Sequence, residues 1–449
     1  MSDPVFEILP GIVVTEDMAA LAFADRYGGR LAFCHDHGKW FEYDGNTWRI
    51  CRVPAALQYA RELARRLSVS APSGAQLQKT KFAQGVETFA RIDPVFRRTA
   101  DYWDRDPFLL GTPSGTVDLR TGRLRSPMQS DNITKSTAIA PEELEDCGLW
   151  HAFIRQATAG DAGMERFLQQ ICGYALTGDV SEQSLFFIHG PGGAGKGVFI
   201  NTIKNIMADY AKTAGMETFA ARRSSAHPTD LAGLHGARLV TASETEEGAA
   251  WDEARIKQLT GADVISARFM RQDFFEYMPQ FTLLIVGNYQ PVLRTVDEAM
   301  RRRFNIIPFI YVPQKPDTKL EQKLKEEWPA ILRWMINGCV DWQKNGLVRP
   351  QSVLDATDEY FEEQNTIKQW IERDCVTETG NFYMMESTTA LFESWAKFAK
   401  ASGIPAGSAK SFKPAMTRMG FDYHHTTHGR YFRQITLKPN DHRGEYGPD

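Results

Sequence analysis

Residues 190–197 read Gly-Pro-Gly-Gly-Ala-Gly-Lys-Gly and directly follow the apolar run Leu-Phe-Phe-Ile at 185–188. This order predicts a buried strand, a glycine-rich loop and then a helix, as in a phosphate-binding P-loop. Glycines let backbone N–H groups converge on anionic oxygens, and the helix start and Lys196 add positive charge. A glycine turn with a chance lysine would not explain the flanking elements. The sequence therefore predicts an ATP site made by Gly190, Pro191, Gly192, Gly193, Ala194, Gly195, Lys196, Gly197 and Val198.

Gly197 departs from the usual P-loop pattern, which has Ser or Thr after the lysine. That hydroxyl normally touches the Mg²⁺ that accompanies ATP. Without it, we expect Mg²⁺ to be held in another way, through water and nearby acids.

Two further strand ends carry candidate catalytic groups. An apolar strand from 238 ends at Glu244, which can orient and deprotonate water and hold Mg²⁺, with Glu246 as a neighbouring candidate. The alternative for these acids is a solvated acidic loop. Another apolar strand ends at Asn288, an uncharged amide that can hold the attacking water or the γ-phosphate. Taken alone, Asn288 is better explained as a turn residue before Pro291.

Basic residues follow in two places. Arg301, Arg302 and Arg303 lie between an expected helix and strand, where one arginine could stabilise phosphoryl charge across a subunit boundary. A salt-bridged helix end is the alternative. Residues 264–277 alternate around Met270–Asp273 and predict a hairpin that carries Arg268 and Arg271, which suits a nucleic-acid backbone. Surface hairpins often carry arginines, so this pattern alone is weak.

Composition sets limits on the whole chain. Its 449 residues carry a net charge of −4, so any DNA contact must be local. The six cysteines include no C-x-x-C pair, which favours a reducing compartment and argues against structural zinc. Cys34-His35-Asp36-His37 has no complementary second cluster for a metal. No signal peptide or long apolar run is present, so we expect a cytoplasmic protein.

The strand pattern predicts an α/β fold. Short apolar strands at Leu185–His189, Arg238–Ser243, Phe281–Gly287 and Asn305–Phe309 alternate with helices, which predicts a parallel sheet covered on both faces. The expected domains are an α+β N-terminal domain at 1–145, an ATPase core with a helical lead-in at 146–312, a helical lid at 313–375 and a tail at 376–449. The N-terminal domain should contain helices near 19–27 and 55–69 and hairpins near 40–49 and 115–124. Pro329 is expected to interrupt or kink the helical segment 320–338.

The tail differs from the rest of the chain in charge, because it is locally basic. Residues 390–443 hold nine Lys or Arg against three acids. Helices followed by a short hairpin suggest a winged helix, which can read duplex DNA. His424, His425 and His428 could adjust its charge with pH. A packing or protein-contact module is the alternative.

These motifs, in this order, resemble those of the superfamily 3 helicases, and most closely the helicase half of phage, plasmid and poxvirus primase–helicases. The spacing is compact, with 48 positions from Lys196 to Glu244 and 44 from Glu244 to Asn288. Ala-Ser-Glu-Thr-Glu, Lys-Gln-Leu-Thr-Gly-x-Asp, Gly-Asn-Tyr-Gln-Pro and Arg-Arg-Arg-Phe all have counterparts in that family. Gly-Thr-Val-Asp-Leu-Arg-Thr-Gly at 115–122 resembles its pre-helicase domain. The likeness covers about residues 15–375.

The resemblance implies an AAA+-like P-loop ATPase that moves on single-stranded DNA as a ring, expected to be a hexamer. Lys196 would be the P-loop lysine, Glu244 the Walker B acid and metal ligand, Asn288 the sensor and Arg302 the arginine finger. Lys257 would lie in the family's extra motif, with Arg268 and Arg271 on its DNA-contacting hairpin. Ser243 replaces an acid found in many relatives.

The expected function is therefore an ATP-dependent DNA helicase in the replication of a phage, prophage or plasmid. A nucleotide-switched ATPase that binds or loads at duplex origin DNA is the alternative, supported by Gly197, and an ATPase that moves a partner protein is a third. The region before 145 is taken up by the pre-helicase domain, and we see no polymerase-type acidic triad. We therefore expect priming to come from a separate primase or polymerase.

Overall fold

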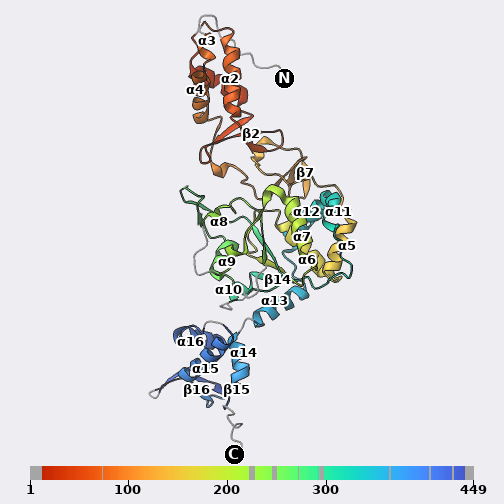
Figure 1. The fold of residues 1–449 in the computed structure, drawn as a ribbon, viewed down its shortest axis with the longest axis vertical. Coiled ribbons are helices and arrows are strands. Elements are labelled where there is room, and N and C mark those ends of the chain that lie inside the picture. The colour runs from red at the N-terminus through yellow and green to blue at the C-terminus, as the bar shows by residue number, and fades with distance from the viewer. Residues whose placement is uncertain are drawn as a thin grey trace, which may run out of the picture. The chain divides into compact units, whose positions relative to one another are not determined.

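The computed structural model divides the chain into two compact units. Unit 1 comprises residues 1–292 and 298–357, and unit 2 comprises 293–297 and 358–449. The described residues are 13–72, 74–221, 228–244, 250–271, 273–291, 293, 298–363, 366–403, 406–426 and 429–439. Figure 1 shows the ribbon, and each unit is described by itself.

Unit 1 begins with a helical and aromatic part. Its elements are α1 (Glu16–Tyr27), β1 (Leu31–Cys34), β2 (Lys39–Tyr43), β3 (Trp48–Ile50), α2 (Ala55–Ser68), α3 (Gly74–Leu77), α4 (Thr80–Ile92) and β4 (Arg97–Arg98). The strands form a sheet in the order β3-β2-β1-β4. Apolar residues at helical spacing on α1, α2 and α4 are buried in one cluster around Phe23 and Phe96. The helices and the aromatic hairpin expected here are confirmed.

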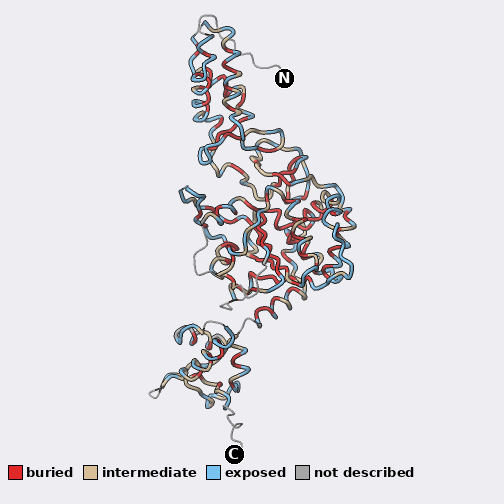
Figure 2. The backbone as a smooth tube through the Cα atoms, viewed as in Figure 1, coloured by how far each residue is buried: buried red, intermediate tan, exposed pale blue. Residues whose placement is uncertain are grey.

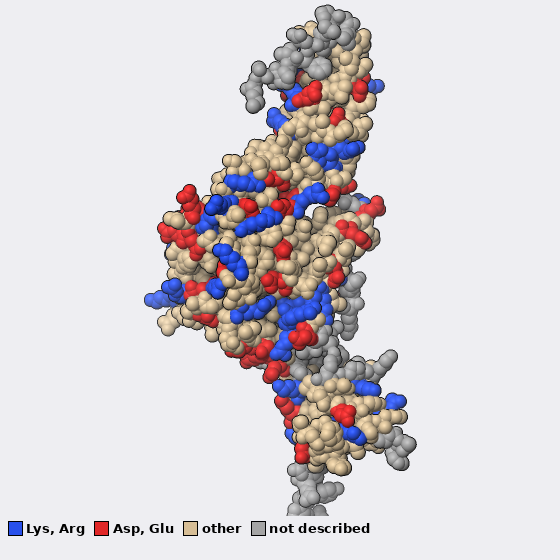
Figure 3. Space-filling view, turned by 180° about the vertical axis from the view of Figure 1, so that it is seen from behind, with Lys and Arg blue, Asp and Glu red and all other residues tan. Residues whose placement is uncertain are grey.

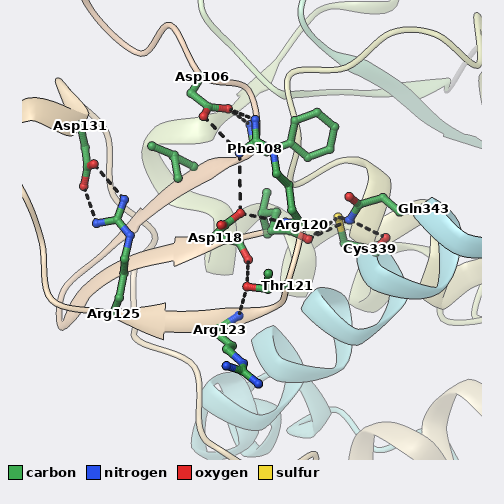
Figure 4. A network of polar contacts seen from close by, with 12 residues as sticks. Asp106, Phe108, Asp118, Arg120, Thr121, Arg123, Arg125, Asp131, Cys339 and Gln343 are labelled. Atoms are coloured by element: carbon green, nitrogen blue, oxygen red, sulfur yellow. Dashed lines mark hydrogen bonds and ion pairs between the residues drawn. The ribbon is translucent and has the colours of Figure 1, made fainter.

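A small antiparallel sheet links this part to the rest of unit 1. It consists of β5 (Leu109–Thr112), β6 (Gly115–Asp118) and β7 (Arg123–Arg125), so the expected second hairpin is confirmed. Figure 4 shows its polar contacts, in which Arg120 binds Asp106 and Arg125 binds Asp131 with two hydrogen bonds each. Paired bonds of this kind fix the orientation of both side chains.

The centre of unit 1 is a parallel sheet of five strands in the order β14-β8-β13-β10-β9. The strands are β8 (Leu185–His189), β9 (Ala211–Thr213), β10 (Leu239–Glu244), β13 (Thr282–Gly287) and β14 (Phe304–Pro308). The four strands expected from the sequence are confirmed to within one residue at each end. Both faces of the sheet are buried (Figure 2). Strands buried on both faces have near-continuous apolar sequences, and this is why the four strands could be recognised in the sequence.

Alternate residues of β8 lie on opposite faces of the sheet. Phe186 and Ile188 belong to the main core, which also takes residues from α5 (Gly148–Ala157), α6 (Ala162–Tyr174), α7 (Lys196–Met207) and α12 (Trp328–Asn345). Phe187, on the other face, contacts Trp251 edge-on. The sheet therefore lies between two apolar layers, as the sequence predicts.

The helices after the sheet continue this core. α11 (Leu320–Leu324) is followed by a 3₁₀ turn and then by α12, with Pro329 in its first turn. The expected interruption at Pro329 is confirmed, because proline is tolerated only where no helical N–H bond is needed. α12 shares the main core of unit 1 with α6, whereas residues from 358 onward belong to unit 2. The segment expected as a lid, 313–375, is thus shared between the units.

Unit 2 is a small α/β assembly. After α13 (Gln351–Glu363), it contains α14 (Thr366–Asp374), β15 (Cys375–Thr377), β16 (Met385–Ser387), α15 (Thr388–Ala401), α16 (Ala409–Arg418), β17 (Tyr423–Thr426), β18 (Gly429–Arg433) and β19 (Ile435–Leu437). The strands pair as β16-β18-β17 and β15-β19. Trp370, Trp395 and Phe432 lie in its own core. The expected order of helices followed by a hairpin is confirmed.

Two glycines allow α6 and α12 to approach closely. A Cβ on Gly173 would overlap backbone atoms of Gly338 and Cys339, and a Cβ on Gly338 would overlap the carbonyl of Gln169. We expect Gly173→Ala to destabilise the fold by about 3 kcal/mol, because backbone cannot yield as a side chain can. Urea and thermal unfolding would measure the loss. Gly148→Ala is the matched control, since a Cβ there meets nothing within 4 Å. Equal stability of the two variants would contradict the close approach.

Candidate functional site

Three candidate segments lie at one edge of the parallel sheet. His189, the last residue of β8, pairs in register with Gly287 of β13, which in turn pairs with Glu244 of β10. The P-loop, Asn288 and Glu244 therefore follow neighbouring strand ends. The carboxyl ends of parallel strands form the usual ligand-binding edge of an open α/β sheet.

The P-loop backbone has positive φ at three glycines, Gly190, Gly193 (φ of 84°) and Gly195, and close neighbours restrict two of them further. Gly190 has φ of 157°, and an added Cβ would overlap the carbonyl of Phe309. Gly195 has φ of 87°, and its Cβ would lie 2.7 Å from the ring of Phe153. Residues with a side chain are strained at such positive φ values. The loop therefore depends on close packing against Phe309, directly after β14, and against α5 as well as on its own sequence.

Lys196, the first residue of α7, is almost buried at 8% exposure. Its Nζ donates to the carbonyl oxygens of Gly190 at 2.5 Å and Pro191 at 2.8 Å, and to Oδ1 of Asn288 at 2.9 Å. Burial lowers the pKa of Lys196. Within the described residues, the partners of this ammonium are these three neutral oxygens.

Asn288 therefore does more than form a turn. Its side chain is tied to the P-loop lysine, which joins the ends of β8 and β13. His189 lies beside this contact and was not predicted from the sequence. Burial and the charge of Lys196 lower the pKa of His189. The one sequence feature that could have identified His189 is its position directly before the glycine-rich loop.

The acid segment is described only in part. Glu244 closes β10 in register with Gly287, but its side chain is not described. Glu246 lies outside the described residues, as does the loop 245–249. Ser243 is exposed. The backbone register alone brings Glu244 to the edge that carries the P-loop.

An apolar pocket of about 410 Å³ adjoins the P-loop. Its walls come from α5, from Gly193–Gly195 and from the segment 311–320 after β14. Gln156, Tyr311, Lys315 and Asp317 carry its polar side-chain atoms, and the other lining side chains are apolar. A concave apolar site beside a phosphate-binding loop has the size and character that suit a nucleobase. Its walls come from separate segments, so the sequence analysis did not find it.

The structure distinguishes the three consecutive arginines. α10 (Glu298–Arg301) ends at Arg301, which is partly buried. Arg303 is buried, and its guanidinium donates to the Ala299 carbonyl at 2.7 Å. Arg302 is exposed, and its side chain makes no hydrogen bond or ion pair within the described residues. Of the three, Arg302 is thus the one available to another molecule.

The expected hairpin is present as β11 (Ile265–Ala267) and β12 (Phe275–Tyr277), paired antiparallel. Arg268 is exposed and lies over the ring of Phe274 at 4.8 Å. Arg271 is exposed near the tip, with φ of 61°. Lys257 lies on α9 (Glu253–Thr260), outside the hairpin, and is partly buried. The tip combines cations with exposed aromatic and apolar groups, including Phe269 and Met270.

Charge over the back view of the molecule is mixed in sign. Figure 3 shows basic and acidic side chains interspersed over the face of unit 1 that it presents. Among the described residues, no group of three or more His, Cys, Asp or Glu side chains is arranged to hold a metal ion. No helix in the described parts is both long and apolar enough to cross a membrane.

Two protein-family models match the chain. Residues 20–159 match the family described as "D5 N terminal like". Residues 188–303 match a family of unknown function, DUF5906. The second match begins inside β8 and covers the P-loop, β10, the hairpin and β13.

Curated relatives carry helicase names. The helicase-named protein L207/L206 of Acanthamoeba polyphaga mimivirus is 25% identical over 66% of this chain and 33% of its own length. The helicase-named protein 022R of Frog virus 3 is 23% identical over 52% of this chain and 26% of its own length. The matched part of the chain thus spans only a quarter to a third of these relatives.

A solved structure shares the fold. The apo C-terminal region of NrS-1, residues 305–718, aligns with a TM-score of 0.51 at 11% identity and covers 95% of this chain and 100% of that one. At this identity the likeness concerns the fold alone. With the two family matches and the helicase-named relatives, it supports the resemblance found in the sequence. The family matches and the helicase-named relatives together support a D5-like superfamily 3 helicase.

Proposed function

We propose that the protein is an ATP-dependent DNA translocase of the helicase type that acts in the replication of a viral, phage or plasmid element. One observation carries the proposal: Lys196 joins the P-loop to Asn288 at the sheet edge where the Glu244 strand also ends. The helicase names of the viral relatives support the same reading.

In this proposal the P-loop N–H groups and Lys196 bind the phosphates of ATP. The Lys196 ammonium would exchange its two carbonyl partners for phosphate oxygens, which bear full negative charge. Glu244 would orient the attacking water as general base, and Asn288 would hold that water or the γ-phosphate. The apolar pocket beside Gly193–Gly195 would take the base.

Mg²⁺ would arrive with ATP. The residues fit it in part: Glu244 supplies a hard oxygen donor, whereas Gly197 supplies none. A Cβ at Gly197 would meet nothing within 4 Å, so the start of a side chain there is unobstructed. The ion would therefore depend on water, phosphate and Glu244.

Arg302 is proposed as the finger that reaches the site of a neighbouring copy in a ring. An exposed guanidinium at the end of a helix can stabilise charge on the transferring phosphoryl group. Its neighbour Arg303 is occupied by internal carbonyl contacts. The number of copies in the ring is expected to be six from the family resemblance.

Single-stranded DNA is the proposed track. Arg268, Arg271 and the aromatic tip of the β11–β12 hairpin can contact backbone and bases. Unit 2, with three helices and a β17–β18 hairpin, is proposed as a winged helix for duplex DNA. The alternative, a switch ATPase with little unwinding, is favoured by Gly197 and would hydrolyse ATP without strand displacement.

The first test is ATP hydrolysis with and without single-stranded DNA. We expect DNA to stimulate the wild type, with a stimulation that fades as salt rises. Lys196→Ala should lower hydrolysis about a hundredfold or more, because the phosphate charge loses its main counter-ion. Arg271→Ala should weaken the stimulation of ATP hydrolysis by DNA. Arg123→Ala removes another exposed arginine, on the small β5–β6–β7 sheet, and is the matched control that should keep this stimulation.

Strand displacement by the same variants completes that test. Unwinding by the wild type that is lost in Lys196→Ala supports the helicase. Hydrolysis that DNA neither stimulates nor couples to unwinding would reject it.

Gly197→Thr should restore the missing hydroxyl without disturbing the loop, because the position is open. We expect hydrolysis to reach half its maximum at a lower Mg²⁺ concentration than in the wild type. Gly197→Ala adds a methyl group but no hydroxyl and is the matched control. If the two variants have the same Mg²⁺ dependence, position 197 does not face the metal.

Mixing two inactive variants tests the shared site. Lys196→Ala retains Arg302, and Arg302→Ala retains Lys196, so a mixture can assemble some complete sites at subunit boundaries. We expect the mixture to recover hydrolysis that neither variant has alone. Recovery with Arg301→Ala in place of Arg302→Ala would move the finger to Arg301. No recovery, in rings that an affinity tag on one variant alone shows to contain both variants, would reject a finger supplied by the neighbour.

A further inference from the structure

A second pocket that could bind a chain of phosphates lies between α2 and α4, far in sequence from the P-loop. A pocket of about 380 Å³ is lined by both helices and by the segment before α4. Its lining side chains are Pro54, Leu57, Gln58, Arg61, Ala64, Arg65, Leu77, Gln78, Lys79, Thr80 and Ala83.

Three cations line this pocket without an acid. Arg61, Arg65 and Lys79 are exposed at its rim, and among the described lining residues none is an acid. Arg61 and Arg65 are four residues apart on α2, so they share one face and repel each other. No hydrogen bond or ion pair within the described residues engages any of the three side chains. The nearby carboxylate of Glu62 accepts from Gln58 but does not line the pocket.

The rim is held in place by hydrogen bonds. Gln78 donates to Oγ of Ser68 at 3.0 Å, and that hydroxyl donates to the carbonyl of Arg65 at 2.7 Å. Leu77 is buried beside them at 3% exposure. These contacts anchor the segment before α4 to the end of α2. Lys79 is thereby kept opposite the two arginines.

The floor of the pocket is apolar. Ala64, Leu77 and Ala83 are buried and belong to the core of the α1–α2–α4 part, and Leu57 packs against it. Cations around an apolar floor match a nucleotide, whose phosphate is anionic and whose base is flat and apolar on its faces. The volume is in the range of pockets that bind one small ligand.

The larger cavity of unit 1 is less suitable. It measures about 1200 Å³ and is lined by several acids, including Asp36, Asp101 and Glu276. Two of its cations are already ion-paired, Arg49 with Asp209 and Lys135 with Asp104. A phosphate chain would meet repulsion there. The contrast makes the α2–α4 pocket the stronger candidate for a polyanion.

We propose that the α2–α4 pocket is a second nucleic-acid site, which binds single-stranded DNA through phosphate contacts of Arg61, Arg65 and Lys79 with one base against Leu57 and Leu77. The inference extends the proposed DNA function to a part of the chain far in sequence from the β11–β12 hairpin. A duplex offers phosphates but no free base faces, so it should use this pocket less. This site requires neither ATP nor Lys196.

The test is binding of a fluorescent 20-nucleotide single strand to the full chain without ATP, followed by anisotropy at several salt concentrations. Arg61→Ala combined with Arg65→Ala should weaken binding about tenfold or more at moderate salt, and adding Lys79→Ala should weaken it further. Each lost phosphate contact should reduce the slope of log affinity against log salt by about 0.7. Arg66→Ala, on the same helix but outside the pocket, is the matched control and should bind as the wild type does.

Three outcomes separate this inference from the proposed function. DNA binding with an unchanged salt slope in the triple variant overturns the pocket but leaves the motor intact. An equal loss for a duplex of the same length overturns the preference for single strands. A photoreactive oligonucleotide that crosslinks within residues 54–83, also in Lys196→Ala, supports the pocket even if hydrolysis fails. Competition by deoxynucleoside monophosphate as strong as that by the oligonucleotide would instead assign the pocket to free nucleotides and overturn the DNA site.

Discussion

The contact between Lys196 and Asn288 is the constraint around which the candidate site is organised. Placing an ammonium group at 8% exposure is costly unless its protons find acceptors. Here the three acceptors are two carbonyl oxygens of the loop itself and the amide at the end of β13. The loop is therefore closed by the same side chain that a triphosphate would attract. Phosphate oxygens would be stronger partners than carbonyls, because they bear negative charge.

A buried arginine holds the other end of the acid strand. Arg238 precedes β10, is 5% exposed and donates to the carbonyl oxygens of Leu176 at 2.8 Å and Leu109 at 2.9 Å. These carbonyls belong to the segment after α6 and to β5. The strand that ends at Glu244 is thus anchored at its start to both the lead-in helices and the small β5–β6–β7 sheet.

Much of the fold could be predicted because buried parallel strands leave an unmistakable apolar signal. β8, β10, β13 and β14 each follow such a run, and the glycine loop marks which strand precedes the site. The sequence also places Lys196, Glu244 and Asn288 after strands. It does not reveal that β13 lies directly beside β8, and this adjacency is what lets Asn288 reach Lys196.

Features that depend on packing between distant segments could not be predicted. Three adjacent arginines look alike in a sequence, yet Arg303 is buried against Ala299 whereas Arg302 is exposed. The base-sized pocket needs α5 and the segment 311–320, which only the folded sheet brings together. The cationic pocket likewise needs the turn before α4 to carry Lys79 back toward α2.

The boundary between the two family matches does not coincide with the boundary of the candidate nucleotide site. The match to the "D5 N terminal like" family runs to residue 159 and so includes α5. Phe153 of that helix packs under Gly195, and it lines the apolar pocket with Leu149 and Ala152. The second family match starts at residue 188, after this helix. A fragment limited to 188–303 would keep the P-loop sequence but lose the wall against which the loop is shaped. The N-terminal family segment is therefore a structural component of the proposed ATP site.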